Sequence, residues 1–258
     1  MAPFLDALVA AALLMATPFG AQGQGAALRP SGGGVSESEG PAVTGTAAPS
    51  QVIGRSVQGR AIRARLVGDA TAPVKVVVVG CVHGNETAGE AVTRRLRGLP
   101  PPAGVALWLV DEFNPDGCAA DTRQNAHGVD LNRNFPYRFR RLPRGTYYSG
   151  PRALSEPEAR AIHRFVQRER PALSIWYHQH ADLVDESGGD PAVERRYARL
   201  VGMRFERFDR PPGSITSWQN HTYPDATAFV VELPAGRLSA SATARHARAV
   251  LTLAREAS

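Results

Sequence analysis

Apolar and polar stretches alternate along residues 74–254 in a way that predicts strands separated by helices. Runs rich in β-branched and aromatic residues predict strands buried on both faces, at 74–80, 105–110, 172–177 and 226–233. Stretches with apolar residues at helical spacing predict helices after Glu86, from Ser155, at 190–204 and at 239–254. This order predicts an α/β fold, a single domain whose central mixed, mostly parallel sheet carries helices on both faces.

Two local patterns refine these elements. Ser155 and Glu158 have the spacing of a capping box and Pro157 suits a first helical turn, so a helix is expected to open at Ser155. Asn114-Pro115-Asp116-Gly117, just after the strand at 105–110, predicts a turn.

Residues 1–23 have the composition of a secretory signal peptide. An apolar run from Leu5 to Phe19 is too short to span a bilayer comfortably, and Ala21-Gln22-Gly23 forms a small-x-small cleavage pattern. The segment before the run contains Asp6 and no Lys or Arg, which favours the alternative, a disordered tail on a cytoplasmic protein. We expect export to the periplasm, cell wall or medium, with no stable membrane insertion once the signal is removed.

The rest of the chain divides into a linker and one domain. Residues 24–50 contain mainly Gly, Ala, Ser, Pro and Thr, which cannot offset the entropy of ordering, and are expected to be a flexible linker. With 258 residues and 43% hydrophobic content the chain can bury one sizeable core. Residues 51–258 are therefore expected to form a single domain, and the protein to be a monomer.

The chain carries a formal net charge of +6. Lys75 is the only lysine, and the arginines are scattered rather than gathered in a stripe with aromatic residues, which argues against nucleic acid as a partner. A basic exported domain suits an anionic cell envelope, although a compositional bias toward arginine explains the count equally well.

The two cysteines, Cys81 and Cys118, follow neighbouring parts of the predicted sheet. If the strands at 74–80 and 105–110 are adjacent, the two thiols lie close together. Export would then permit a disulfide, whereas in the cytosol both would be buried, inert thiols.

Candidate metal ligands and a candidate base lie where the predicted strands end. His83 and Glu86, three residues apart on the turn that leaves the first strand, can close on one divalent ion. His178 and His180 leave another strand, where alternation would put both on one face, so either is a possible ligand. Glu232 lies within a strand that is expected to be buried, where a carboxylate needs a partner or a function.

The long stretch at 111–144 is too specific in composition to be a simple connector. Arg123, Asn132 and Arg133 within it offer hydrogen-bond donors suited to a carboxylate or an oxyanion. A solvated basic loop is the alternative.

The order of these motifs resembles the zinc metallocarboxypeptidases, and within them the compact bacterial branch of murein peptide amidases. From about residue 74 to 236 the chain contains His-Gly-Asn-Glu, Thr-Arg, Asp-Leu-Asn-Arg-Asn-Phe-Pro, a strand-end His and a strand-borne Glu. The resemblance implies one zinc ion and these roles: His83, Glu86 and His178 hold zinc, with His178 favoured over His180; Arg123 polarises the scissile carbonyl; Asn132 and Arg133 grip the substrate carboxylate; Glu232 is general base and acid.

The resemblance also implies a substrate, the γ-D-glutamyl–diaminopimelate amide of cell-wall peptides. Acidic residues at 182–190 are expected to meet the amine of diaminopimelate, with a solvated loop as the alternative. Rival functions are a conventional metallocarboxypeptidase on small peptides, an N-acyl-amino-acid deacylase, and an inactive wall-binding relative. Larger members of the family have a mobile tyrosine about twenty residues before the catalytic glutamate; residues 208–214 contain none, and Tyr223 is the nearest.

Overall fold

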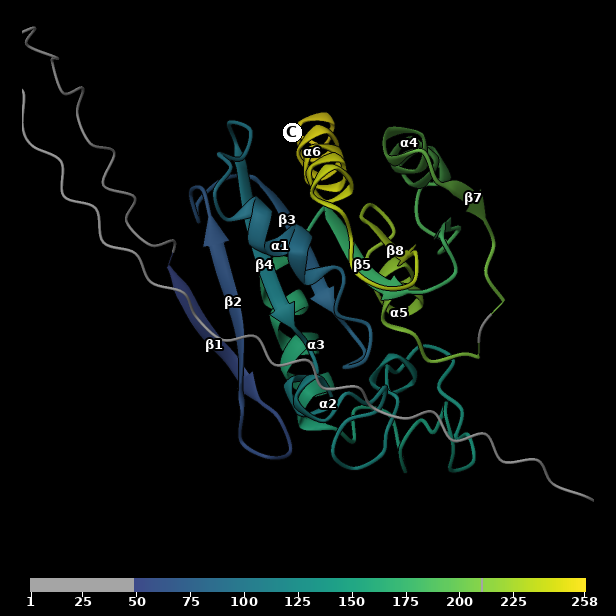
Figure 1. Ribbon diagram of the computed structural model, residues 1–258. Helices are drawn as coiled ribbons and strands as arrows, with labels where there is room; N and C mark the ends of the chain where they lie inside the picture. The colour runs from purple at the N-terminus through teal and green to yellow at the C-terminus, as the bar shows by residue number, and fades with distance from the viewer. Residues whose placement is uncertain (1–48, 210) are drawn as a thin grey trace, which may run out of the picture. The chain divides into compact units, whose positions relative to one another are not determined.

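The computed structural model describes residues 49–209 and 211–258. Its centre is an eight-stranded sheet in the order β1-β2-β4-β3-β5-β8-β6-β7 (Figure 1). The strands are β1 (Ser50–Arg55), β2 (Ala61–Val67), β3 (Val74–Cys81), β4 (Val105–Glu112), β5 (Leu173–Gln179), β6 (Leu183–Asp185), β7 (Arg204–Glu206) and β8 (Thr227–Leu233). The helices are α1 (Glu90–Leu96), α2 (Pro115–Ala120), the 3-10 helix η1 (Leu131–Arg133), α3 (Pro157–Glu169), α4 (Pro191–Val201), α5 (Ile215–Thr222) and α6 (Ala240–Glu256).

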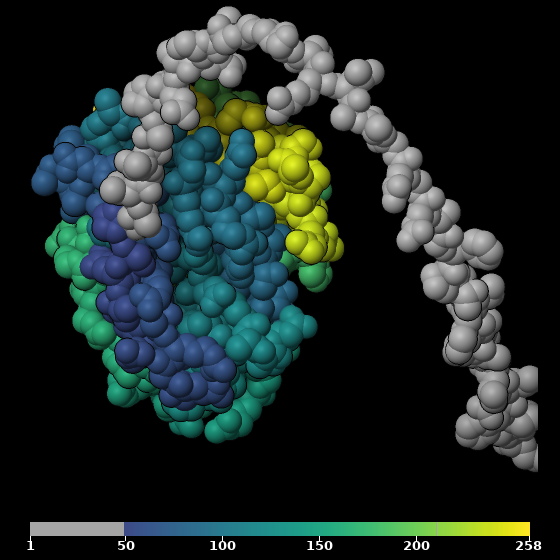
Figure 2. All heavy atoms as spheres, turned by 60° about the vertical axis from the view of Figure 1, so that its left-hand side comes forward, coloured from purple at the N-terminus to yellow at the C-terminus, as the bar shows by residue number. Residues whose placement is uncertain are grey.

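The sheet is mixed, with a parallel centre. Strands β4, β3, β5 and β8 run parallel, whereas β2 joins β4 and β6 joins β8 in antiparallel pairs. The strand β1 forms one exposed edge (Figure 2). The predicted mixed, mostly parallel sheet is confirmed, and the carboxyl ends of its parallel strands meet along one edge.

Helices cover both faces of the sheet, as predicted. Alternate residues of β3 serve different layers, because successive side chains of a strand point to opposite faces. Val76 and Val78 pack in the layer formed with α1, α4 and α6. Val77 and Val79 pack in the opposite layer, with α3 and α5. A strand buried on both sides needs a continuous apolar run, which is why β3 was recognisable from its sequence.

Some predicted boundaries were wrong. The helix expected to open at Ser155 begins at Pro157, and its N-cap Glu156 makes no side-chain capping bond. The predicted capping box does not form, because Glu158 instead accepts a hydrogen bond from the Val57 backbone N–H at 2.9 Å. The Ser155 hydroxyl donates to the Glu156 carboxylate at 2.6 Å.

The expected turn at Asn114 is the start of a helix. Asn114 is the N-cap of α2, and its side chain accepts a hydrogen bond from the Gly117 N–H, with Pro115 in the first turn. The helix expected over 190–204 ends at Val201, because Gly202 adopts a left-handed conformation (φ 71°). Six further elements lacked a prediction: β1, β2, β6, β7, α5 and the 3-10 helix η1.

The predicted signal peptide and most of the predicted linker lie outside the described residues. Among the described residues, the first element is β1, which begins at Ser50, one residue before the domain boundary expected at 51. None of the helices in the described ranges combines the length and apolar character needed to cross a membrane.

Candidate active site

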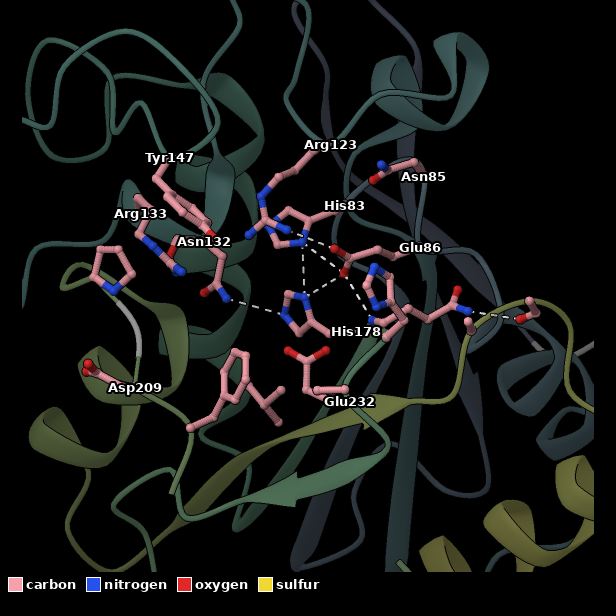
Figure 3. Close-up of a pocket in the computed structure, with 18 residues that line it drawn as sticks. His83, Asn85, Glu86, Arg123, Asn132, Arg133, Tyr147, His178, Asp209 and Glu232 are labelled. Atoms are coloured by element: carbon pink, nitrogen blue, oxygen red, sulfur yellow. Dashed lines mark hydrogen bonds and ion pairs between the residues drawn. The ribbon is translucent and has the colours of Figure 1, made fainter. Parts of the chain in front are cut away.

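The sheet register brings the predicted site residues to one edge. Trp176 of β5 pairs with Val79 of β3, so the segments that leave these two strands are neighbours. On the other side of β5, His178 pairs directly with Glu232 of β8. The ends of the parallel strands therefore bring together polar groups that are far apart in the sequence: His83, His178 and Glu232 (Figure 3).

The three predicted metal ligands converge. His83 Nδ1 and His178 Nδ1 each lie 2.9 Å from the same oxygen, Oε2 of Glu86, and 3.1 Å from each other (Figure 3). All three side chains are buried. Two imidazole nitrogens and one carboxylate oxygen close together beside a cavity are the donor types that a catalytic zinc site with an open position uses. The residues fit a zinc ion.

The electrostatics of this cluster also suit a cation. Burial alone would raise the pKa of Glu86, but His83 and the hydrogen bond from His178 outweigh it, and the pKa lies well below its usual value. Burial lowers the pKa of His178 to about 4, so its imidazole is neutral at pH 7, the form that ligates metals. Burial likewise lowers the pKa of His83, but Asp130 and Glu86 raise it by more.

Asp130 is a functional residue that sequence reasoning missed. Its Oδ1 accepts a hydrogen bond from His83 Nε2 at 2.9 Å, and its side chain is fully buried. A carboxylate in this position fixes the ring orientation and tautomer of a ligating histidine. Asp130 is the first residue of the Asp-Leu-Asn-Arg motif. A metal-ligating histidine needs a hydrogen-bond partner for its second ring nitrogen, and this requirement could have pointed to Asp130.

Arg123 is held against the metal cluster by two carboxylates. Its guanidinium donates to Asp130 Oδ2 from Nε at 3.1 Å and from Nη2 at 3.0 Å, and to Glu86 Oε1 from Nη1 at 2.8 Å. Burial alone would lower the pKa of Arg123, but Asp130 and Glu86 raise it, so the group stays cationic. Arg123 therefore lies directly beside the candidate metal ligands. Its expected role at the scissile carbonyl stays a prediction.

Asn132 and Arg133 lie on η1 at the same cavity. The Asn132 Oδ1 accepts a hydrogen bond from the Ile215 N–H at 3.0 Å, and its Nδ2 lies 3.3 Å from His178 Nε2. The backbone of Gly213 (φ +90°) lies so close to Arg133 that a Cβ would come within 2.5 Å of the Arg133 carbonyl oxygen. This contact fixes η1 against the segment before α5.

The predicted residues share one cavity of about 440 Å³. It is lined by all seven, His83, Glu86, Arg123, Asn132, Arg133, His178 and Glu232. Glu232 is only 9% exposed. His180 lines the cavity rim and is exposed, and it stands outside the ligand cluster. The expected alternation fails at His180 because β5 ends at Gln179.

Two of the acidic residues expected to meet an amine form hydrogen bonds within the fold. The buried Asp185 accepts hydrogen bonds from the Ser187 hydroxyl and the Phe208 N–H, and Asp190 caps α4. Neither residue lines the cavity, and neither does Asp182. Asp185 and Asp190 are therefore engaged within the fold, whereas the contact expected of this segment with an amine stays a prediction for the exposed Asp182 and Glu186. Besides Glu86 and Glu232, the cavity is lined by one further acid, Asp209, which the sequence analysis did not single out (Figure 3).

The two cysteines lie beside the metal-ligand turn. The Sγ atoms of Cys81 and Cys118 are 2.9 Å apart, and both residues are free thiols in this structure. The expectation that they lie close together is confirmed.

The α/β fold and the three converging ligands are those expected of the zinc carboxypeptidase class. A family model described as zinc carboxypeptidase matches residues 104–198. Murein peptide amidase A of Vibrio campbellii is 30% identical over 179 residues, which cover 61% of this chain and 68% of that protein. The chain belongs to the zinc carboxypeptidase family.

Other relatives agree with this assignment. Murein peptide amidase A of Escherichia coli K12 is 32% identical over 168 residues, which cover 55% of this chain and 64% of that protein, a little less than two thirds of its length. The solved structure of a murein-tripeptide amidase from Escherichia coli O157 has the same fold, with a TM-score of 0.69 at 24% identity over 82% of this chain and 94% of that one. Carboxypeptidase A from Helicoverpa armigera has a TM-score of 0.67 at 18% identity, over 82% of this chain and 68% of that one.

Proposed function

We propose that this chain hydrolyses an amide bond next to a carboxylate-bearing residue, with the γ-D-glutamyl–diaminopimelate bond of cell-wall peptides as its substrate. One observation carries the hydrolytic part of the proposal: His83, Glu86 and His178 converge in a cavity that also holds Arg123 and Glu232. The choice of a cell-wall peptide rests on the names of the relatives in Escherichia coli and Vibrio.

Each residue of the cavity has a distinct task in this proposal. A zinc ion held by His83, Glu86 and His178 would supply the Lewis acid that activates water and polarises the carbonyl. Glu232, at the end of β8, accepts a proton from the attacking water and passes it to the leaving amine. Arg123 donates hydrogen bonds to the carbonyl oxygen as negative charge develops there.

In this proposal Arg133 gives the cavity its preference for a carboxylate, and Asn132 supports it. The guanidinium of Arg133 faces the cavity from η1, where it can pair with the carboxylate of the residue on the leaving side of the bond (Figure 3). Asn132, anchored by the Ile215 N–H, holds η1 and His178 in register.

The roles of Glu232 and His83 are separable by mutation. Glu232→Gln should retain zinc and fold but lower kcat by a factor on the order of 10²–10⁴, because the amide removes the proton acceptor without removing a ligand. His83→Ala should lose both zinc and turnover. Zinc content by atomic emission and steady-state kinetics check both. Parent-like turnover of Glu232→Gln would remove Glu232 from the mechanism.

The substrate is tested by direct comparison. We expect the parent protein to cleave L-Ala-γ-D-Glu-meso-diaminopimelate faster than hippuryl-Phe or hippuryl-Arg. Faster cleavage of either hippuryl peptide would make the chain a conventional carboxypeptidase. Preference for an N-acetyl amino acid would make it a deacylase, and the absence of turnover from zinc-loaded protein would contradict the proposed activity altogether.

A further inference from the structure

Two exposed aromatic side chains stand at the candidate active site. Among the described residues, three large hydrophobic side chains are strongly exposed: Val52 and Tyr147 at 46% and Phe208 at 41%. Tyr147 and Phe208 both line the cavity, whereas Val52 lies on the edge strand β1. A single exposed apolar group is ordinary, but two at the mouth of one polar cavity mark a surface that a ligand covers.

Tyr147 contacts both arginines that face the substrate. Its ring centroid lies 5.2 Å from Cζ of Arg123 and 5.4 Å from Cζ of Arg133. Figure 3 shows the three side chains together on one wall of the cavity. Cation–π attraction holds the ring beside both guanidinium groups at once.

The position of the ring fixes what it can touch. In the proposed function, Arg123 binds the oxygen of the scissile carbonyl and Arg133 binds the carboxylate of the residue on the leaving side. The Cα of that residue lies between these two groups of the substrate. A ring that contacts both guanidinium groups therefore lies beside that Cα and the side chain it carries.

We propose that Tyr147 is a substrate-contacting residue that determines specificity, with its ring covering the side chain of the residue on the leaving side of the scissile bond. This inference rests on the proposed function. The ring suits a side chain with an aliphatic stem, such as the methylene groups of diaminopimelate, because stem and ring bury apolar surface against each other.

The test compares two substrates that differ only in that side chain, L-Ala-γ-D-Glu-meso-diaminopimelate and L-Ala-γ-D-Glu-Gly. Tyr147→Ala should raise KM for the diaminopimelate peptide about tenfold, the effect of exposing roughly two methylene groups, and change KM for the glycine peptide by no more than about twofold. Tyr147→Phe, which keeps the ring, should recover most of the loss. Val52→Ala, which removes an equally exposed side chain far from the cavity, is the matched control and should leave both KM values unchanged.

A binding measurement separates contact from catalysis. In the Glu232→Gln background, calorimetry should show weaker binding of the diaminopimelate peptide when Tyr147→Ala is added, with zinc content and melting temperature unchanged. Equal losses for the two peptides would mean that the ring acts only through the arginines, and would overturn the proposal. A Kd of the double variant equal to that of Glu232→Gln alone would also overturn it.

The proposed substrate and the role of Tyr147 can fail independently. If the parent protein prefers hippuryl-Phe, the substrate assignment is wrong, and the same comparison is made with hippuryl-Phe and hippuryl-Gly. A larger loss with hippuryl-Phe than with hippuryl-Gly would still support the contact, and equal losses would reject it. A parent protein that cleaves neither series contradicts the proposed function and the Tyr147 contact together.

Discussion

Asp130 organises the site at the scale of single residues. One of its oxygens orients His83 and the other receives two hydrogen bonds from Arg123, so one buried carboxylate positions both a metal ligand and a substrate-facing cation. Its pKa lies well below the usual value: burial alone would raise it, but the nearby His83 and Arg123 outweigh that effect. The carboxyl group of Asp130 is therefore ionised at neutral pH.

We expect Asp130→Asn to weaken zinc binding by about 10- to 100-fold, because an amide is a poorer partner for a ligating imidazole. The affinity is measured by competition with a chromogenic chelator. Asp121→Asn, at an exposed position at the end of α2, is the control and should bind zinc like the parent. Equal affinities of the two variants would show that Asp130 has no influence on the metal site.

A second buried carboxyl group predicts a dependence of stability on pH. Glu194 of α4 is fully buried, and its Oε2 has no hydrogen-bond partner among the described groups. Burial, aided by the charge of Asp185, raises its pKa to about 7. The folded-state pKa of Glu194 lies above the unfolded value of 4.5. The contribution of this group to the free energy of unfolding is therefore fully present below pH 4.5 and is lost as the pH rises through about 7.

Glu194→Gln should therefore stabilise the protein at pH 8 by about 1–3 kcal/mol and change little at pH 4.5, since the amide is neutral at both values. Urea unfolding at the two pH values measures the difference. Glu206→Gln, on the exposed strand β7, is the control. A gain of the same size at both pH values would mean that Glu194 is not titrating.

At the scale of elements, the turn that carries His83 packs directly on α2. A Cβ at Gly84 would come within 1.9 Å of the carbonyl carbon of Gly117, so only glycine allows the two backbones to approach this closely. Cys81 ends β3 and Cys118 lies on α2, with their Sγ atoms 2.9 Å apart. A covalent bond here would tie the metal-ligand turn to the helix that leads to Arg123.

We propose that Cys81 and Cys118 form a disulfide in an oxidising compartment. The bridge would close a loop of about 37 residues and should stabilise the oxidised protein by about 2–4 kcal/mol over the reduced form. Mass spectrometry of non-reduced peptides identifies the bond, and urea unfolding with and without a reductant measures its effect. Cys118→Ser, which cannot form the bond, should show no response to the reductant. Two free thiols in exported protein would refute the bridge.

At the scale of the whole molecule, we propose that residues 1–23 direct export and that the domain acts outside the cytoplasm. The apolar run and cleavage pattern support this proposal, and a cell-wall substrate requires it. Residues 1–50 fused to a mature β-lactamase should give a Gram-negative host resistance to ampicillin, because the reporter acts only after export. Deleting residues 5–19 should abolish resistance. Equal resistance with and without the apolar run would contradict the proposed signal.

The sequence determined the central strands and the candidate ligands, for a local physical reason. A strand buried on both faces must be almost wholly apolar, so β3, β4, β5 and β8 were visible without any knowledge of their neighbours. His83, Glu86 and His178 stood out because polar, metal-binding side chains directly follow such runs. Their order along the chain resembled one family strongly enough to assign roles to seven residues.

The tertiary structure decided everything that depends on partners far away in the chain. Nothing in the sequence distinguished Asp130 from other carboxylates, and only the fold places it against His83. Likewise, only the fold places the loop residue Tyr147 beside two arginines. Conversely, the sequence suggested that Asp185 could bind a substrate, whereas in the structure its carboxylate accepts hydrogen bonds from the Ser187 hydroxyl and the Phe208 N–H. Composition and periodicity report how much of a segment is buried, but the identity of a hydrogen-bond partner is set by contacts between distant segments, which only the folded chain brings together.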